Sequence, residues 1–120
     1  MTDRECFLRE PRTTALHVWL TTRLGALVAT GSERDVSFFH TASRAAVTVT
    51  PNIEGGPFTS VYVVGDDLPW RTDVEFARDA TAALGGVVRC ALPGEQARCL
   101  EMSAGGEAIV DIEPAFGTTG

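Results

Sequence analysis

Three carboxylates, an arginine and a tryptophan lie close together in the segment GDDLPWRTD. The carboxylates belong to Asp66, Asp67 and Asp73, and Trp70 and Arg71 stand between them. Side chains of these types can bind a metal ion, act as a general acid and base, or contact another protein. The spacing and the surrounding residues decide which of these uses the segment favours.

Metal binding and catalysis both lack supporting residues. A metal ion would need more oxygen ligands than Asp66 and Asp67 supply, and the D-x-D-x-D-G spacing of a calcium loop does not occur. Acid–base chemistry would need a pocket with a nucleophile or an activated water. No histidine or lysine is near the segment, and the motifs G-x-S-x-G and H-E-x-x-H and a phosphate-binding glycine loop do not occur. We therefore predict no catalytic residue, no metal site and no cofactor.

The contact hypothesis rests on residue type. Trp and Arg are the residues most enriched at binding hot spots, and aspartates around them would add a charged rim. The predicted partner-binding surface consists of Asp66, Asp67, Trp70, Arg71, Asp73 and Glu75. A structural alternative exists for Trp70, because a ring two residues before a helix cap can cover the first helical turn and close the core. The aspartate pair would then cap a turn.

The net charge of −6 is unevenly spread along the chain. Residues 1–50 carry six arginines and five acids, a balance of +1, whereas residues 51–120 carry four arginines and eleven acids, a balance of −7. An acidic half suits one basic protein partner, because complementary charge speeds encounter and rejects wrong partners. The lack of a basic stripe argues against nucleic-acid binding. The alternative is that the acidic surface serves only solubility.

The N-terminus and the hydropathy predict a cytoplasmic protein without membrane contact. The first residues, MTDRECFLREPRT, alternate charges and contain no apolar signal region. No apolar run approaches the ~18 residues that a membrane-spanning helix needs.

The cysteines and histidines form no recognisable ligand set. We expect Cys6, Cys90 and Cys99 to be reduced thiols. A two-residue hairpin at PGEQ would place Cys90 opposite Cys99, so a pairing of these two is left open, although the proline cannot donate the hydrogen bond of that position. His17 and His40 are isolated, and neither C-x-x-C nor H-x-x-x-H occurs.

Most of the other segments have the composition of strands. These are TALHVWLTT, GALVATG, VSFFHTA, AAVTVTP, FTSVYVV, VVRCAL, ARCLEMSA and EAIVDIE. FTSVYVV is the most apolar and is expected at the centre of the sheet, after a meander of short strands. Over residues 16–24 a helix competes with a strand, because Leu16, Leu20 and Leu24 are four apart; the β-branched content favours the strand.

One helix has clear start and stop signals. Thr72 is a capping residue and Glu75, three positions on, completes a capping box by reaching back to the amide of the cap, while paired glycines end the helix. The predicted fold is α+β, with an antiparallel sheet of about six to seven strands and one main helix, residues 73–84, packed on it. The whole chain is expected to be one domain, with residues 1–12 and 114–120 as loose termini.

A resemblance is carried by VYVVGDDLPWRTDVEFARDATAALGGVVRC and, more weakly, by CLEMSAGGEAIVDIE. The first stretch, around residues 61–90, resembles a group of small uncharacterised bacterial proteins in which G-D-D leads through W-x-T-D to a helix F-A-R-x-x-A-x-x-L-G and a strand ending V-R-C. In that group the Cys is followed by Asp-Pro-Gly, whereas ALPGEQ follows Cys90 here. The group is similar in size, acidity and lack of catalytic motifs to immunity proteins that neutralise bacterial toxins.

This resemblance implies a non-catalytic inhibitor of the immunity or antitoxin type, whose acidic face occludes a basic toxin or enzyme. One alternative is a small-molecule-binding domain or minor enzyme with a pocket between helix and sheet, in which His17, His40 or Cys90 would be the reactive group. Another is a self-associating structural subunit, with Trp19 or the phenylalanines at 38 and 39 on an exposed sheet face. A homodimer is left open.

Overall fold

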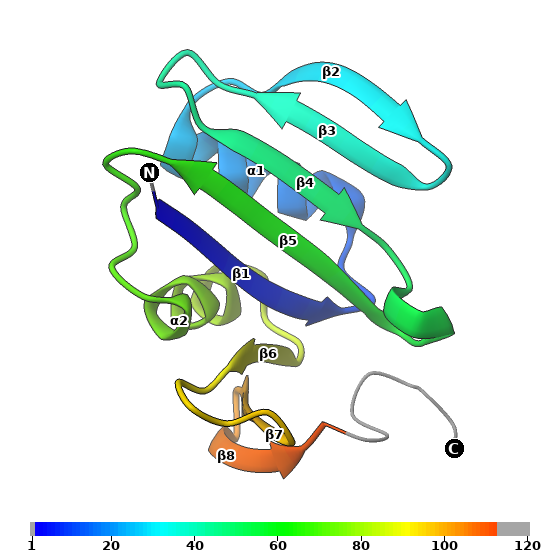
Figure 1. Cartoon of the computed structure of the whole chain (residues 1–120), viewed down its shortest axis with the longest axis vertical. Coiled ribbons are helices and arrows are strands. Elements are labelled where there is room, and N and C mark those ends of the chain that lie inside the picture. Colours follow the sequence, from blue (N-terminus) through cyan, green and yellow to red (C-terminus); the bar gives the residue numbers. More distant parts are fainter. Residues whose placement is uncertain (1, 113–120) are drawn as a thin grey trace.

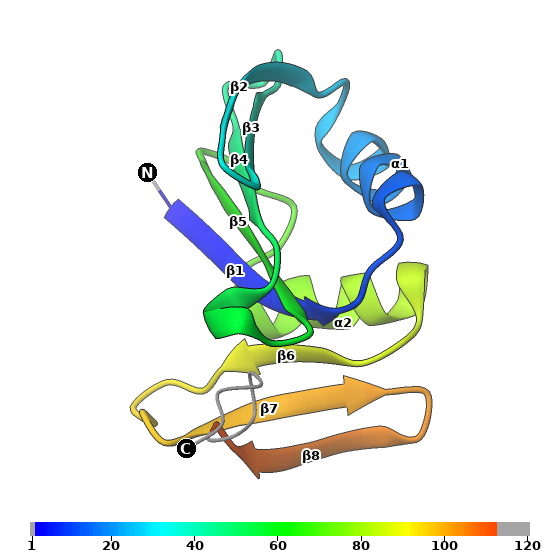
Figure 2. The same cartoon turned by 90° about the vertical axis from the view of Figure 1, so that its right-hand side faces the viewer.

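Two helices cover one face of a single antiparallel sheet, as Figures 1 and 2 show for this computed structural model, which describes residues 2–112. The elements are β1 (Thr2–Arg9), α1 (Thr13–Leu24), β2 (Val28–Glu33), β3 (Val36–His40), β4 (Ala46–Thr50), the 3-10 turn η1 (Ile53–Gly55), β5 (Phe58–Gly65), α2 (Asp73–Leu84), β6 (Val88–Ala91), β7 (Arg98–Ser103) and β8 (Gly106–Asp111). The α+β class is confirmed. The expected six to seven strands and one main helix are corrected to eight strands and two helices.

The strand order is β2-β3-β4-β5-β1-β6-β7-β8, and every neighbouring pair is antiparallel. Three of the four short strands expected in the first meander are present as β2, β3 and β4, whereas the first of them, TALHVWLTT, belongs to α1; β5 lies at the centre of the sheet as predicted. A second meander, β6 to β8, is joined to the first through β1. The strand β1 pairs with β5 along its whole length and with β6 over Phe7 and Leu8. The first strand of the chain therefore holds the two halves of the sheet together.

The prediction that residues 1–12 form a loose terminus is wrong, because residues 2–9 form the central strand β1. Cys6 and Leu8 are buried and face the helices, while Glu5 and Phe7 face the other side. The charged residues obscure the alternation of inward and outward side chains in the sequence, because Arg4 points inward. Its guanidinium group donates hydrogen bonds to backbone carbonyls there. The predicted loose segment 114–120 lies outside the described residues.

The preference for a strand over residues 16–24 is also wrong, because these residues belong to α1. Leu16, Trp19 and Leu20 are buried at helical spacing, and Leu24 continues the same face. The N-cap residue, Arg12, makes no side-chain cap bond, and no acidic residue stands in the first turn. Packing of this face on the sheet therefore outweighs the weak helix propensity of its β-branched and aromatic residues.

The helix predicted over 73–84 is confirmed with those bounds as α2. The hydroxyl of Thr72 accepts a hydrogen bond from the N–H of Glu75 at 3.1 Å, as expected of a cap. The Glu75 carboxylate departs from the expected capping box, because it accepts from the N–H of Arg71 at 3.2 Å. Both bonds satisfy backbone donors at the helix entrance, and so tie the preceding loop to the helix.

The core lies between the two helices and the sheet. Its largest fully buried side chains there include Phe76 and Leu20 from the helices and Val47, Val61, Val63 and Met102 from the strands.

Among the described residues, neither helix has the length and apolar character needed to cross a membrane.

Candidate functional site

The loop that joins β5 to α2, residues 66–72, lies against the N-terminal half of β1. The Arg4 guanidinium of β1 donates to the carbonyl oxygen of Trp70, at 2.9 Å, and to that of Arg71. Each bond is charge-assisted and satisfies a loop carbonyl that has no strand partner. An inward-facing arginine of the first strand therefore holds the predicted binding segment in place.

The chain is closely packed around Gly65, the last residue of β5. A Cβ atom there would lie 3.2 Å from Cδ2 of Leu68 and 3.3 Å from Cα of Ala45. These distances are slightly shorter than ordinary van der Waals contacts, so a side chain at position 65 would require Leu68 or Ala45 to shift by a few tenths of an ångström. The close approach lets Leu68 fold back over the end of β5.

Further carboxylates reach this place from β1. The N–H of Glu5 donates to the Asp73 carboxylate at 3.0 Å, and the Glu5 carboxylate accepts from the Ser60 hydroxyl at 2.6 Å. The Tyr62 hydroxyl donates to Asp3 at 2.8 Å. The pKa of Tyr62 is raised, first by this hydrogen bond and then by burial and by the negative charges of Asp3, Glu5 and Asp73. Asp3 thus contacts the phenol directly, and the charges of Glu5 and Asp73 act on it from farther away.

We name this region the acidic end of the sheet. It consists of the carboxylates Asp3, Glu5, Asp66, Asp67, Asp73 and Glu75. Glu5 and Asp73 are partly buried and the others are exposed. Arg4 and Arg71 are the cations placed among them, so the local charge is strongly negative. Sequence reasoning found the four acids of the loop and helix but missed Asp3 and Glu5, because it treated the first residues as loose.

Trp70 does not belong to the exposed part of this region. Its side chain is 4% exposed and lies in the core, with ring centroids 4.3 Å from Phe76 and 5.9 Å from Trp19. This decides the question left open by the sequence in favour of the structural alternative. As an apolar anchor for a partner, the predicted role of Trp70 is wrong, because the neighbouring helices already cover its ring.

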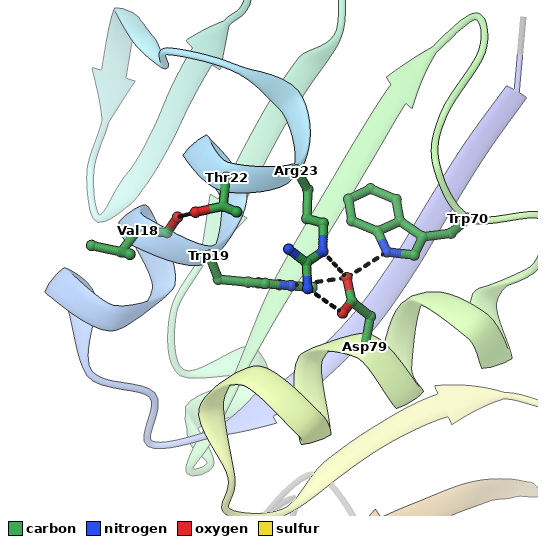
Figure 3. A network of polar contacts seen from close by, with 6 residues as sticks. All are labelled: Val18, Trp19, Thr22, Arg23, Trp70 and Asp79. Carbon is green, nitrogen blue, oxygen red and sulfur yellow. Dashed lines mark hydrogen bonds and ion pairs between the residues drawn. The ribbon is translucent and has the colours of Figure 1, made fainter.

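A single carboxylate, that of Asp79 in α2, joins both tryptophans to an arginine (Figure 3). Its Oδ2 atom accepts from the indole N–H groups of Trp19, at 3.1 Å, and Trp70, at 2.9 Å. Arg23 donates to the two carboxylate oxygens through Nε at 2.7 Å and Nη2 at 2.8 Å. The Arg23 bond is the largest cause that lowers the pKa of Asp79 to about 2; burial opposes it, and the two indole bonds add to it.

This network, which we call the Asp79 hub, connects α1, α2 and the loop. Trp19 and Arg23 come from α1, Trp70 comes from the loop, and Asp79 comes from α2. Two indole donors that would otherwise be buried without partners are satisfied together. The hub therefore fixes the loop that carries Asp66 and Asp67, through the buried indole of Trp70.

The cysteines are structural thiols. Cys6, Cys90 and Cys99 are all free and buried. Burial is the main cause that raises the pKa of Cys90 to about 11, so this thiol stays protonated and unreactive at neutral pH. The hairpin register pairs Cys90 with Leu100 and Ala91 with Cys99, one residue away from the register that would bring the two cysteines face to face. The longer loop around the proline explains the shift.

A cavity of about 270 Å³ lies between the start of α1 and the helix-facing side of β3, β4 and β5. His17 lines it and contacts Phe39 edge to face, with ring centroids 4.9 Å apart. His40 and Cys90 are not among its lining residues. Trp19, one of the residues that the self-association hypothesis could place on an exposed sheet face, is 3% exposed, and the alternatives Phe38 and Phe39 are partly buried.

Within residues 2–112, no group of three or more His, Cys, Asp and Glu side chains is arranged to hold a metal ion.

The fold and the site together define a small α+β structure with a charged end on a rigid support. Comparison of the chain with protein-family models, curated proteins and solved structures found no match. The functional proposal therefore rests on the chemistry of the residues themselves.

Proposed function

We propose that this chain is a non-catalytic binding protein of the immunity or antitoxin type, which covers the basic surface of one toxin or enzyme with the acidic end of its sheet. The observation that carries the proposal is that six carboxylates from β1, the loop and α2 lie at one end of the molecule, those of Asp3 and Glu5 on the face of the sheet away from the helices. A partner whose active surface is basic would be attracted to this end and sterically blocked by it.

The exposed carboxylates have the geometry that such a contact needs. Asp67 and Glu75 are exposed, and carboxylates accept short, directional bonds from arginine and lysine. Arg71 lies exposed between them and supplies one positive charge, which would set the register of a partner against the acidic residues. Asp66 and Asp73 complete the predicted set, and Asp73 is anchored by the N–H of Glu5.

Trp70 takes a different part in this proposal from the one the sequence suggested. Its ring packs on Phe76 and its indole N–H donates to Asp79, and these two contacts with α2 hold the loop in place. A loop held in its bound conformation loses little entropy when a partner binds, and this favours affinity. Trp70 is thus a positioning residue, and the partner would meet the charged residues on either side of it.

The test begins with capture of partners from the native host. Tagged protein is incubated with lysate at low salt, and the proteins released as salt is raised are identified by mass spectrometry. The proposal expects one basic protein, in a stoichiometric complex whose affinity falls with salt because exposed charges are screened. Elution of the tagged chain without any partner would count against the immunity-type function.

Matched variants then locate the surface. The double variant Asp67→Asn/Glu75→Gln removes two charges from the acidic end, and Glu33→Gln/Asp111→Asn removes two exposed charges elsewhere. We expect the first to weaken binding of the purified partner by about tenfold at low salt and to flatten its salt dependence, and the second to change it by less than about twofold. Equal losses in both variants would mean that net charge, not the acidic end, drives association.

A further inference from the structure

The cavity beside α1 lies at the opposite end of the strands from the acidic end. The acidic end begins where Thr2 pairs with Gly65, and the cavity is next to the last pair of the same two strands, Arg9 with Phe58. Seven strand steps of ~3.3 Å separate these pairs, which is about 23 Å. The cavity is therefore a separate feature, and the proposed function does not account for it.

Apart from its carboxylates, four polar side chains around this cavity have no hydrogen-bond partner in the described part of the chain. They are Thr13 and His17 from α1, Ser37 from β3 and Thr59 from β5. Thr59 is 8% exposed as a residue, and its hydroxyl keeps some accessible surface, so a molecule in the cavity can reach it. An unpaired set that converges on an open cavity from three elements is suited to a ligand with polar groups.

The rim of the cavity is conformationally fixed. Three prolines, Pro11, Pro51 and Pro57, line it. Two further lining residues, Glu10 and Asn52, have left-handed backbone conformations, with φ of 44° and 50°. Non-glycine residues adopt this region rarely, and surrounding structure must hold them there. The N–H of Glu10 does this by donating to the carbonyl of Pro57 at 2.9 Å. The cavity is thus preformed.

The charges around the cavity select the ligand. Its lining contains two carboxylates, Glu10 and Asp35, and no arginine. Neither carboxylate makes an ion pair within residues 2–112. A negative rim repels anions and attracts cations. Its apolar surface comes from Leu16, Phe39 and Val49, together with the prolines.

We propose that this cavity binds a small organic amine, with its ring or alicyclic body against Phe39 and Leu16 and its protonated amine toward Glu10 and Asp35. The volume of about 270 Å³ is at the lower limit of ligand pockets, ~300 Å³, and so suits a molecule the size of a single ring with a short chain. The hydroxyls of Ser37 and Thr59 and the imidazole of His17 are available to further polar substituents.

Three probes with the same body and different polar groups test the charge requirement: phenethylamine, 2-phenylethanol and phenylacetate. Each is titrated into the labelled whole protein, and the backbone amide shifts are followed by NMR. We expect phenethylamine to shift the amides of His17, Ser37 and Thr59 saturably, in the millimolar range, 2-phenylethanol to bind more weakly, and phenylacetate not to bind. Scattered or non-saturating shifts, or equal binding of the carboxylate, would overturn the proposal.

Two variants test the location. Glu10→Gln/Asp35→Asn should weaken phenethylamine binding by about twofold to fivefold per charge, as exposed ion pairs do, and leave 2-phenylethanol unchanged. Ser37→Leu should fill the cavity and abolish binding of both, whereas Thr48→Leu, on the other face of the sheet, should not.

If Ser37→Leu does not fold, the isosteric change Thr59→Val replaces it. Removal of its hydroxyl should weaken 2-phenylethanol binding without loss of the fold. Unchanged binding in a folded Ser37→Leu or Thr59→Val protein would place the ligand elsewhere and refute the site.

Discussion

Asp67 and Asp79 lie in the same short stretch of chain, yet their carboxylates have different surroundings. Asp79 accepts bonds from two buried indoles and from an arginine on another helix, and these bonds lower its pKa to about 2. Asp67 is exposed, at the turn where the chain leaves β5, with a backbone φ of 55°. One carboxylate is used by the fold, and the other is directed to the solvent.

The difference shows how a structural acid can be told from one available to a partner. A carboxylate has several acceptor positions, and the protein itself supplies the donors for those of Asp79. Within residues 2–112 the Asp67 carboxylate accepts no hydrogen bond, so water or a partner can supply its donors. The partly buried member of this contrast is Asp79, whose carboxylate holds the loop in its conformation. The exposed carboxylates, such as that of Asp67, give the surface its negative charge.

The largest effect is expected from Asp79→Ala. This change leaves the indole N–H groups of Trp19 and Trp70, which are 3% and 4% exposed, without an acceptor. Unpaired buried donors are strongly unfavourable, so the free energy of unfolding should fall by about 3 kcal/mol. Urea denaturation measures it, with Asp67→Asn as the matched control. A loss below about 1 kcal/mol would show that the Asp79 hub contributes little.

The pH dependence of stability tests the same contrast between Asp79 and Asp67. Unlike Asp79→Ala, it changes the charge of the Asp79 side chain but not its size. The pKa of Asp79 is lowered from 3.8 to about 2 by folding, so its contribution is complete above pH ~4 and is lost as pH falls through about 2. It amounts to at most about 2 kcal/mol. Urea curves between pH 6 and pH 2 should show the difference between wild type and Asp79→Asn shrinking toward the acid limit. A constant difference would contradict this assignment.

The two helices show which signals a sequence carries and which it does not. The bounds of α2 were predicted correctly because Thr72, the acids of the first turn and the paired glycines are local signals. The start of α1 has no such signal, and exposed Val18, at 61%, interrupts its apolar pattern. Only the packing of Leu16 and Trp19 on the sheet makes it a helix, and this depends on contacts distant in sequence.

The residues of the candidate site also fall into those that local sequence signals identify and those that only long-range contacts bring there. Asp66, Asp67 and Glu75 were found because they are neighbours in the chain. Asp3 was missed because its place depends on the pairing of β1 with β5, between residues about sixty positions apart. The bond from Trp19 to Asp79 spans a similar separation. Single-sequence patterns describe turns, caps and alternation, so long-range polar contacts of this kind leave no periodic signal.

A smaller effect is expected at the helix entrances, and it sharpens the contrast between α1 and α2. Thr72→Ala removes the acceptor for the N–H of Glu75 and should lower the free energy of unfolding by about 1 kcal/mol. Arg12→Ser should raise it by up to about 1 kcal/mol, because the N-cap of α1 already has an extended backbone and lacks a side-chain cap bond. Thermal and urea unfolding of both variants measure these changes. The two changes in the free energy of unfolding must have opposite signs. A decrease in both variants would mean that α1 is capped in another way.

The smallest effect is expected from Asp67→Asn. Asparagine tolerates the left-handed backbone at φ 55° as well as aspartate does, and the exposed side chain loses only its charge. The free energy of unfolding should change by less than about 0.5 kcal/mol. Asp67→Val keeps the size but is disfavoured in this backbone region, and should be less stable by about 1 kcal/mol. A loss above 1 kcal/mol in Asp67→Asn itself would place the carboxylate among the structural acids with Asp79. A neutral result means that any loss of partner affinity in this variant comes from its surface charge, since the loop beneath it is unchanged.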